Sequence, residues 1–237
     1  MKEAISINNL SYSYPDGHQA LTGVSLQITS GEKVALIGPN GAGKSTLLLH
    51  LNGILSGTGN IKIMGLEPTQ ENLPIIRALV GLVFQNPDDQ LFSPTVFEDV
   101  AYGPIYQGLD KITVQSRVNQ ALDDVHMREY QERVSHHLSL GEKKRIAIAT
   151  VLSMQPEILI LDEPSSGLDP RARRELIRLL RELPQTLLVA THDLLLVREL
   201  LPRAVVIDGG RVAADGDTAE IFSDSFRLES HGLELPT

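Results

Sequence analysis

Residues 38–46 read Gly-Pro-Asn-Gly-Ala-Gly-Lys-Ser-Thr. An apolar run over 33–37 precedes this stretch and predicts a short strand, and residues 46–51 after it predict a helix. A strand, a glycine-rich loop and a helix in this order are the context that a phosphate-binding loop requires. The pattern G-x-x-x-x-G-K-[ST] is matched at its four fixed positions, Gly38, Gly43, Lys44 and Ser45.

The loop is expected to hold the phosphates of a nucleotide. Its backbone N–H groups turn toward one anion, and the dipole of the following helix adds to the attraction. Lys44 would neutralise the β- and γ-phosphates, and the Ser45 hydroxyl would ligate Mg²⁺. A structural glycine-rich turn is the alternative, but such a turn needs no Lys-Ser pair at this spacing. The other residues of the predicted cradle are Asn40, Gly41, Ala42, Gly43 and Thr46.

Composition narrows the class of protein. A chain of 237 residues suits one large α/β domain, with or without an inserted lobe. The net charge of −9 argues against nucleic acid as the main partner, because nucleic-acid-binding domains carry a basic excess. The chain has no Cys, which excludes disulfides and thiolate chemistry. Its apolar runs fall short of the ~18 residues that cross a bilayer, so we expect any membrane role to come through partners.

Hydrophobic periodicity predicts an α/β fold with a helical insertion. The first 66 residues are strand-rich, and strands alternate with helices from residue 158 onward, which indicates a parallel sheet with right-handed crossovers. Between these parts we expect an exposed, loop-rich segment over 86–110 and helices over 116–130 and 139–154. The predicted strands are 4–8, 24–28, 33–37, 60–64, 80–84, 158–161, 186–190 and 204–207, and the later helices are 171–183 and 194–200.

Two carboxylates follow the strand predicted at 158–161. Ligands bind at the carboxyl ends of buried parallel strands, which is where Asp162 and Glu163 stand. Asp162 would hold Mg²⁺ through its water shell, and Glu163 would polarise the attacking water. A strand that merely enters a turn can also end in Asp-Glu, but the loop at 38–46 favours the catalytic interpretation.

Residues 138–142, Leu-Ser-Leu-Gly-Glu, begin a predicted helix. Ser139 and Glu142 have the S-x-x-E spacing of a helix capping box, which is found at many helix starts. A capped helix start also presents free N–H groups and a positive dipole end to an anion. Both interpretations are therefore kept for this segment.

The ordered set of motifs resembles the ATP-binding-cassette (ABC) ATPases over about residues 3–222. Residues 38–46 match their Walker A motif, and residues 158–163 match their Walker B motif with its catalytic Glu. Residues 138–142 look like their L-S-G-G-Q signature, with Leu140 and Glu142 as departures. The remaining matches are Gln85 in the Q-loop, Asp169 in the D-loop at 166–169, the switch histidine His192, and Tyr14, where the family places an aromatic ring on adenine.

The resemblance implies a fold and a reaction. The fold is α/β, a P-loop NTPase of ABC type with a mixed β-sheet core, an N-terminal antiparallel β-subdomain and an α-helical subdomain inserted at about 86–155. The reaction is hydrolysis of ATP with Mg²⁺, in which Glu163, His192 and Gln85 are catalytic. Ser45, Gln85 and Asp162 would hold the Mg²⁺ ion. Tyr12 is interpreted as structural, and a plain turn residue is the alternative for His192.

The resemblance also implies a second ATPase subunit, placed head to tail as a homodimer or heterodimer. A phosphate loop on one chain leaves the γ-phosphate open to water and short of positive charge. A second helix start would close the site and supply donors where charge develops. In the family, those groups belong to the signature and D-loop of the partner, which correspond here to Ser139, Gly141, Glu142 and Asp169.

Residues 85–92, Gln-Asn-Pro-Asp-Asp-Gln-Leu-Phe, are similar to the Q-loop of energy-coupling-factor (ECF) ATPases, which power uptake of vitamins or of cobalt and nickel ions. Residues 14–17 and 141–145 are similar to the same branch. The resemblance implies a transmembrane coupling subunit docked beside the Q-loop, a substrate-binding membrane subunit, and a place on the cytoplasmic face of the membrane. The short segment after the core favours cobalt or nickel, with biotin as the alternative cargo. A polar turn cluster without a partner is the alternative for 86–94.

A non-transport ABC ATPase, of DNA repair, chromosome structure or translation, is the competing class. Such proteins usually carry a coiled-coil insertion, two cassettes in one chain, or basic arms. This chain has one uninterrupted cassette and an acidic balance, which favours transport without a nucleic-acid partner. Glu163 and His192 together argue against a module that only binds nucleotide.

Overall fold

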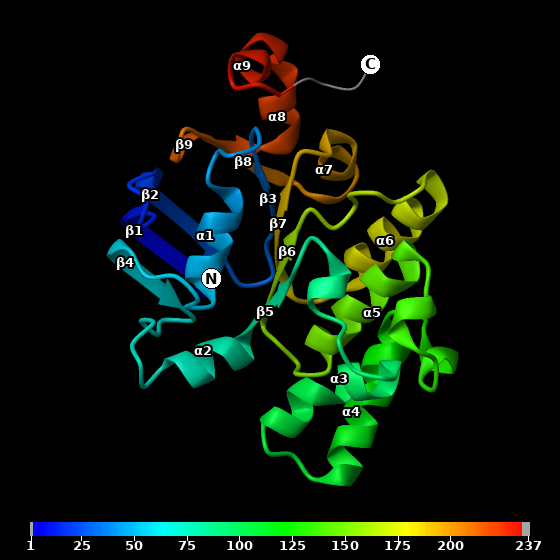
Figure 1. Cartoon of the computed structure of the whole chain (residues 1–237). Helices are drawn as coiled ribbons and strands as arrows, with labels where there is room; N and C mark the ends of the chain where they lie inside the picture. The colour runs from blue at the N-terminus through cyan, green and yellow to red at the C-terminus, as the bar shows by residue number, and fades with distance from the viewer. Residues whose placement is uncertain (1, 234–237) are drawn as a thin grey trace.

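A computed structural model describes residues 2–233, whose strands form two sheets (Figure 1). The smaller sheet is antiparallel, with the order β2-β1-β4. The larger has the order β5-β6-β7-β3-β8-β9 and is parallel except for β9, which pairs antiparallel with β8. This mixed sheet with a separate antiparallel sheet confirms the predicted fold class. The strands are β1 Glu3–Ser13, β2 Gln19–Thr29, β3 Lys33–Ile37, β4 Thr58–Ile63, β5 Val80–Val83, β6 Ile158–Asp162, β7 Thr186–Thr191, β8 Arg203–Asp208 and β9 Arg211–Asp217.

The central strands are buried on both faces. Along β3, Val34 and Leu36 join the core shared with the antiparallel sheet and α1, while Ala35 and Ile37 join the core beneath the other helices. The same alternation is found in β6, β7 and β8. These strands are almost entirely apolar because their side chains are buried in a core on each face of the sheet. The helices are α1 Lys44–Leu51, α2 Leu73–Leu79, α3 Val96–Tyr106, α4 Lys111–Asp124, α5 Leu140–Leu152, α6 Pro170–Glu182, α7 Leu194–Leu200, α8 Thr218–Ser223 and α9 Ser225–Ser230.

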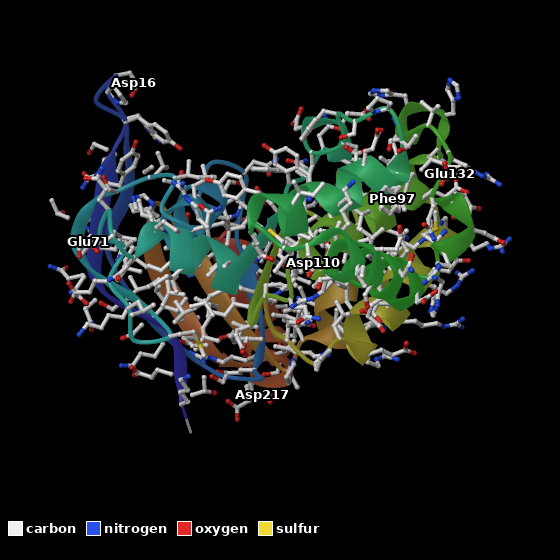
Figure 2. All side chains as sticks on the ribbon, turned by 90° about the horizontal axis from the view of Figure 1, so that it is seen from below. Asp16, Glu71, Phe97, Asp110, Glu132 and Asp217 are labelled. Atoms are coloured by element: carbon white, nitrogen blue, oxygen red, sulfur yellow. The ribbon has the colours of Figure 1, made fainter. Side chains whose placement is uncertain are left out.

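Helices α3, α4 and α5 pack against one another as a lobe beside the sheets. Seen from below, this lobe, marked by Phe97 and Asp110, lies opposite the antiparallel sheet, marked by Asp16 and Glu71 (Figure 2). The lobe does not have a core of its own, because its buried side chains belong to the same cluster as those of α6 and one face of the large sheet. No helix among residues 2–233 combines the length and apolar character needed to span a bilayer.

The expectation of a loop-rich segment over 86–110 is wrong, because α3 lies inside it. A capping box starts this helix: the Thr95 hydroxyl accepts from the Glu98 N–H, and the Glu98 carboxylate accepts from the Thr95 N–H. Gly103 and Pro104 lie inside this helix, and because Gly and Pro usually interrupt helices, the sequence pattern predicted a loop here. Gly103 faces Met154, where a Cβ would clash, so the glycine serves close packing of α3 on α5.

The helix expected over 116–130 also differs from the observed one. The observed helix, α4, starts at Lys111, because the Asp110 carboxylate accepts hydrogen bonds from the N–H groups of Ile112 and Thr113. It ends at Asp124, and His126 then adopts a φ of 57°, which breaks the helical path before a short 3₁₀ turn at Arg128–Tyr130. Elements that the sequence did not reveal are α2, β9, α8 and α9.

One arginine joins the two sheets. Arg203, at the start of β8, makes a bidentate pair with Asp215 of β9, with both distances at 2.7 Å. Its guanidinium also donates to Glu32 at 2.7 Å and to the carbonyl of Gln27 at 3.0 Å. Burial alone would raise the pKa of Glu32, but the hydrogen bonds from Arg203 and Thr29 outweigh it and lower that pKa. The bond between Arg203 and Glu32 therefore stabilises the fold at pH values above the ordinary carboxyl pKa. This stabilisation is lost as the pH falls through the lowered pKa of Glu32.

We expect Arg203→Met to lower the free energy of unfolding by about 1.5–3 kcal/mol, because two carboxylates lose a charged donor. Arg211→Met, on an exposed arginine of β9, is the matched control and should change it by less than about 0.5 kcal/mol. Urea denaturation of both variants at neutral pH measures the difference. Equal stability of the two variants would contradict the linking role of Arg203.

Candidate active site

A cavity of about 310 Å³ lies where β3, β6 and β7 reach their carboxyl ends. It gathers residues from every predicted motif of the nucleotide half-site, although they are widely separated in the chain. Parallel pairing explains this, since strands that run together end at one edge. The lining residues are Tyr14, His18, Ala20, Asn40, Gly41, Gly43, Lys44, Ser45, Thr46, Gln85, Asp162, Glu163 and His192. Ala42 is instead buried in the core beneath the loop.

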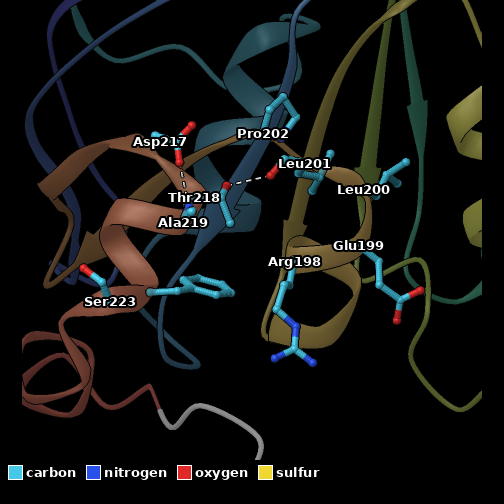
Figure 3. A pocket seen from close by; sticks show the side chains of 10 residues that line it. Arg198, Glu199, Leu200, Leu201, Pro202, Asp217, Thr218, Ala219 and Ser223 are labelled. Atoms are coloured by element: carbon cyan, nitrogen blue, oxygen red, sulfur yellow. Dashed lines mark hydrogen bonds between the residues drawn. The ribbon is translucent and has the colours of Figure 1, made fainter.

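A wider cavity of about 670 Å³ lies between α7 and α8 (Figure 3). Several of its polar groups have structural partners: Thr218 donates to the carbonyl of Leu201 at 2.6 Å, and Asp217 caps α8. Glu199, at its rim, pairs with Arg173. The smaller cavity, which holds the convergent lysine, carboxylates and histidine, is therefore the candidate active site.

Backbone geometry and hydrogen bonds define the shape of the phosphate loop. Gly43 caps α1 with a φ of 104°, and a Cβ there would lie 2.6 Å from the carbonyl oxygen of Ala20. Lys44 is buried, and its Nζ donates to the carbonyls of Gly38 at 2.7 Å and Pro39 at 3.0 Å. Burial lowers the pKa of Lys44, and the nearby carboxylates Glu163 and Asp162 oppose this shift. A phosphate would therefore meet an ammonium group that is held in place by its own loop.

Tyr14 stands at the other end of the cavity, on the turn between β1 and β2. Its hydroxyl lies 3.0 Å from the Thr46 hydroxyl, and its ring stacks at 17° on that of His18. Tyr12 packs edge-on against Tyr14 and buried His50. Sequence reasoning missed His18 as a lining residue; its place on the same turn as Tyr14 is the signal that could have found it.

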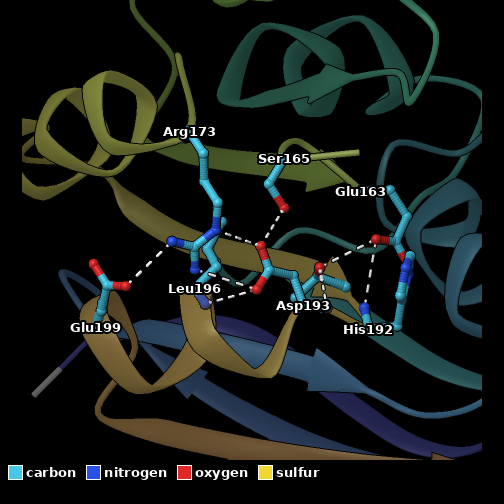
Figure 4. A network of polar contacts seen from close by, with 8 residues as sticks. Glu163, Ser165, Arg173, His192, Asp193, Leu196 and Glu199 are labelled. Carbon is cyan, nitrogen blue, oxygen red and sulfur yellow. Dashed lines mark hydrogen bonds and ion pairs between the residues drawn. The ribbon is translucent and has the colours of Figure 1, made fainter. Parts of the chain in front are cut away.

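Glu163 and His192 lie side by side at the ends of β6 and β7 (Figure 4). The His192 Nδ1 is 2.8 Å from one carboxylate oxygen of Glu163. The other oxygen accepts from the Thr191 hydroxyl at 3.1 Å and from the His192 N–H at 3.4 Å. The Glu163 side chain is 9% exposed and that of His192 60%, so a buried carboxylate is joined to a ring at the cavity mouth.

A second layer fixes the loop after His192 (Figure 4). Asp193 accepts from the guanidinium of Arg173 at 2.8 and 3.2 Å and from the Ser165 hydroxyl at 2.8 Å. Burial would raise the pKa of Asp193, but these bonds and the Leu196 N–H lower it. Arg173 belongs to α6, which directly follows residues 166–169, so this ion pair ties that segment to Asp193, the residue after His192.

Asp162 and Ser45 are the residues whose oxygen atoms would hold a metal ion. Burial raises the pKa of Asp162 and Glu163 adds to the shift, whereas a hydrogen bond with Ser45 and the charge of Lys44 oppose it. A hydroxyl, a carboxylate and the Gln85 amide oxygen around one cavity are the hard donors that Mg²⁺ prefers. The residues present therefore fit Mg²⁺, which when bound would neutralise charge on the β- and γ-phosphates.

A lysine outside the cavity was not found from the sequence. Lys144 of α5 is 5% exposed, and burial lowers its pKa to about 8 against the attraction of Glu163 and Asp162. In the sequence it stands between Lys143 and Arg145 in a charged run, and such a run by itself is typical of a solvated surface. In the structure it is the most buried of the three, and its Nζ donates to the carbonyls of Gln85 and Glu163.

The remaining predicted site residues lie in another cavity, of about 360 Å³, lined by Ser139, Gly141, Glu142 and Asp169. The capping box is formed: the Glu142 carboxylate accepts from the Ser139 N–H at 2.8 Å and from its hydroxyl at 2.7 Å. Leu140 lies against Gly167, where a Cβ would be 2.9 Å from its Cδ2. Within one chain, this cavity shares no lining residue with the phosphate loop.

The arrangement suits cleavage of a phosphoanhydride. It combines a loop for phosphates, a buried carboxylate next to a histidine, and oxygen donors for Mg²⁺.

Comparison with known proteins agrees with this chemistry. A sequence model described as ABC transporter matches residues 21–166. An ABC transporter ATP-binding protein of Gloeobacter violaceus is 55% identical over 239 residues, covering 100% of this chain and 98% of that protein. The energy-coupling factor transporter ATP-binding protein EcfA of Methanothermobacter thermautotrophicus is 49% identical over 238 residues, covering 98% and 76%. The structure of cbiO1 from Clostridium perfringens, part of the ABC transporter complex cbiONQ, has a TM-score of 0.87 and 37% identity, covering 100% of this chain and 97% of cbiO1.

The matched region spans the phosphate loop, the Q-loop, the signature and the Walker B carboxylates. Similarity to the relatives extends over the whole chain, and their names include the energy-coupling-factor type. On the basis of this match and of the site geometry, the chain belongs to the ABC transporter family as an ATPase of the energy-coupling-factor type.

Proposed function

We propose that this ATPase works as a head-to-tail dimer that powers the uptake of cobalt or nickel ions by an ECF importer. The observation that carries the dimer is the separation of the two half-sites. Ser139 and Gly141 lie in a cavity apart from Lys44 and Glu163, so one chain cannot close its own site. A second subunit, identical or related, would bring its signature helix to the γ-phosphate and exclude water.

In the proposed mechanism each residue has a distinct task. Lys44 exchanges its bonds to Gly38 and Pro39 for bonds to phosphate oxygens. Tyr14 stacks on adenine, and Ser45, Asp162 and Gln85 are the residues that would hold Mg²⁺. Glu163 polarises the attacking water, and His192, which now binds that carboxylate, turns to the γ-phosphate. The D-loop of the partner, through the residue equivalent to Asp169, borders the same site.

A membrane coupling subunit is proposed to dock beside the Q-loop. Exposed aromatic rings gather there: Phe92 is 63% exposed and meets Tyr102 edge-on at 5.3 Å, and Tyr106 is 82% exposed. Large exposed apolar side chains in a group favour an interaction surface. Such a subunit would place the chain on the cytoplasmic face of the membrane, next to a substrate-binding membrane subunit.

The proposed cargo rests on the similarity to cbiO1, which is part of the ABC transporter complex cbiONQ. ECF uptake of a vitamin such as biotin is the second candidate, because relatives named EcfA are also similar. ATP-dependent uptake by the reconstituted complex, with Co²⁺, Ni²⁺ and biotin offered side by side, tests the cargo. Transport of biotin without either metal would overturn the cargo and leave the motor intact.

The first prediction concerns chemistry. Lys44→Ala should weaken ATP binding sharply, because the phosphates lose their buried cation. Glu163→Gln should keep ATP binding and lower kcat by ~10²-fold or more, because the amide cannot polarise water as a carboxylate does. Steady-state ATPase assays and equilibrium binding separate the two effects. An unchanged kcat in Glu163→Gln would remove that residue from the mechanism.

The second prediction concerns assembly. Glu163→Gln should dimerise with ATP and Mg²⁺ and dissociate without nucleotide, as sedimentation can measure. Inactive Lys44→Ala and inactive Ser139→Arg should recover activity when mixed, because one of the two composite sites then has both Lys44 and Ser139. The maximum is about half of the wild-type rate if sites act independently. A purified heterodimer with no activity would count against shared sites.

The third prediction concerns coupling. Asp89→Lys and Phe92→Ala should lower uptake by the reconstituted transporter more than they lower the ATPase rate of the isolated chain, because both lie at the proposed docking surface. Phe226→Ala is the matched control: its ring is 80% exposed, but it lies on α9, at the opposite end of the molecule (Figure 1). Equal loss of uptake in Phe92→Ala and Phe226→Ala would refute the docking surface.

A further inference from the structure

A buried lysine that the proposed mechanism does not use lies behind the catalytic carboxylate. The Nζ of Lys144 donates to the backbone carbonyl of Glu163 at 3.0 Å and to that of Gln85 at 3.3 Å. A buried ammonium group is costly unless acceptors surround it, so its presence here needs a reason. Both acceptors belong to segments that carry proposed catalytic groups.

The backbone at Glu163 requires support. Its φ of 45° lies in the left-handed region, which is unfavourable for a residue with a side chain. The N–H of Glu163 donates to the carbonyl of Ala190 at 2.8 Å, and its own carbonyl accepts from the Ser166 N–H as well as from Lys144. Lys144 therefore helps hold the peptide that directs the carboxylate toward His192.

The Q-loop is bound to the same helix at further points. Lys143 donates to Asp88 at 2.7 Å. The Gln90 amide donates to the carbonyl of Ala147 at 2.8 Å and to the Thr150 hydroxyl at 2.7 Å. Residues 85–90 thus follow α5 along its length, and at Lys144 this contact continues to the Walker B strand.

We propose that Lys144 is a positioning residue that couples the Q-loop and the helical lobe to Glu163. One Nζ makes both bonds, so a shift of α5 relative to the sheet changes the support of Glu163 and of Gln85 together. The inference rests on the proposed role of Glu163 in polarising water. It gives the two adjacent lysines different tasks, because Lys143 bonds outward to Asp88, whose side chain is half exposed.

The test compares Lys144→Met with Lys143→Met, which removes the same group from the next position. Lys144→Met should lower kcat by about tenfold or more, because a small displacement of a catalytic group is costly in rate. Its KM and its affinity for ATP should stay within about twofold of wild type, since the phosphate loop is untouched. Lys143→Met should retain kcat within about twofold, and Lys144→Arg, which keeps a charged donor, should recover part of the rate.

Glu163→Gln is measured in parallel so that the two hypotheses fail separately. If Glu163→Gln loses hydrolysis while Lys144→Met keeps the wild-type kcat, the coupling is refuted and the role of Glu163 stands. If Glu163→Gln hydrolyses ATP normally, the role of Glu163 itself fails. A loss in Lys144→Met that is matched by an equal loss of ATP affinity also overturns the inference. Should Lys144→Met not fold, Lys144→Gln, which is neutral and shorter, replaces it with the same criteria.

Discussion

The parallel pairing of β3, β7 and β6 is the constraint on which the site depends. Ile37 pairs with Thr191, and Ala190 pairs with Asp162, so the three strands end at one level. The residues that follow them are therefore brought together: the phosphate loop after β3, His192 after β7 and Glu163 after β6. A shift of this register by one residue would exchange the side chains that face the two cores, and the packing of both cores opposes it.

The charged groups of the site are bonded to one another and to their own loops. Lys44 binds carbonyls of its own loop, and Glu163 is occupied by Thr191 and His192. These bonds satisfy buried polar groups that would otherwise be costly, yet each can be exchanged for a bond to phosphate, water or metal. In the proposed mechanism, hydrolysis therefore requires these contacts to rearrange, which would give a partner protein a physical means of control.

The helical lobe is where such control can enter. Its helix α5 carries the signature at its N-terminus, contacts the Q-loop along its length and touches the Glu163 backbone through Lys144. The exposed aromatic rings of the proposed docking surface lie on α3 and the segment before it, and α3 packs on α5. A force applied to the lobe would therefore reach the strand ends through packed helices and a few hydrogen bonds.

The sequence by itself determined the phosphate loop, the Walker B carboxylates, the capping box at Ser139 and the alternating strand–helix order, because these depend on local spacing and periodicity. It could not reveal α3, whose Gly103 is explained only by contact with Met154, or separate buried Lys144 from its partly exposed neighbours Lys143 and Arg145. Only the family resemblance implied that Ser139 and Lys44 of one chain belong to different half-sites, and the structure places them in separate cavities. Those properties are decided by which surfaces meet, and contacts between distant segments leave no periodic signal in the chain.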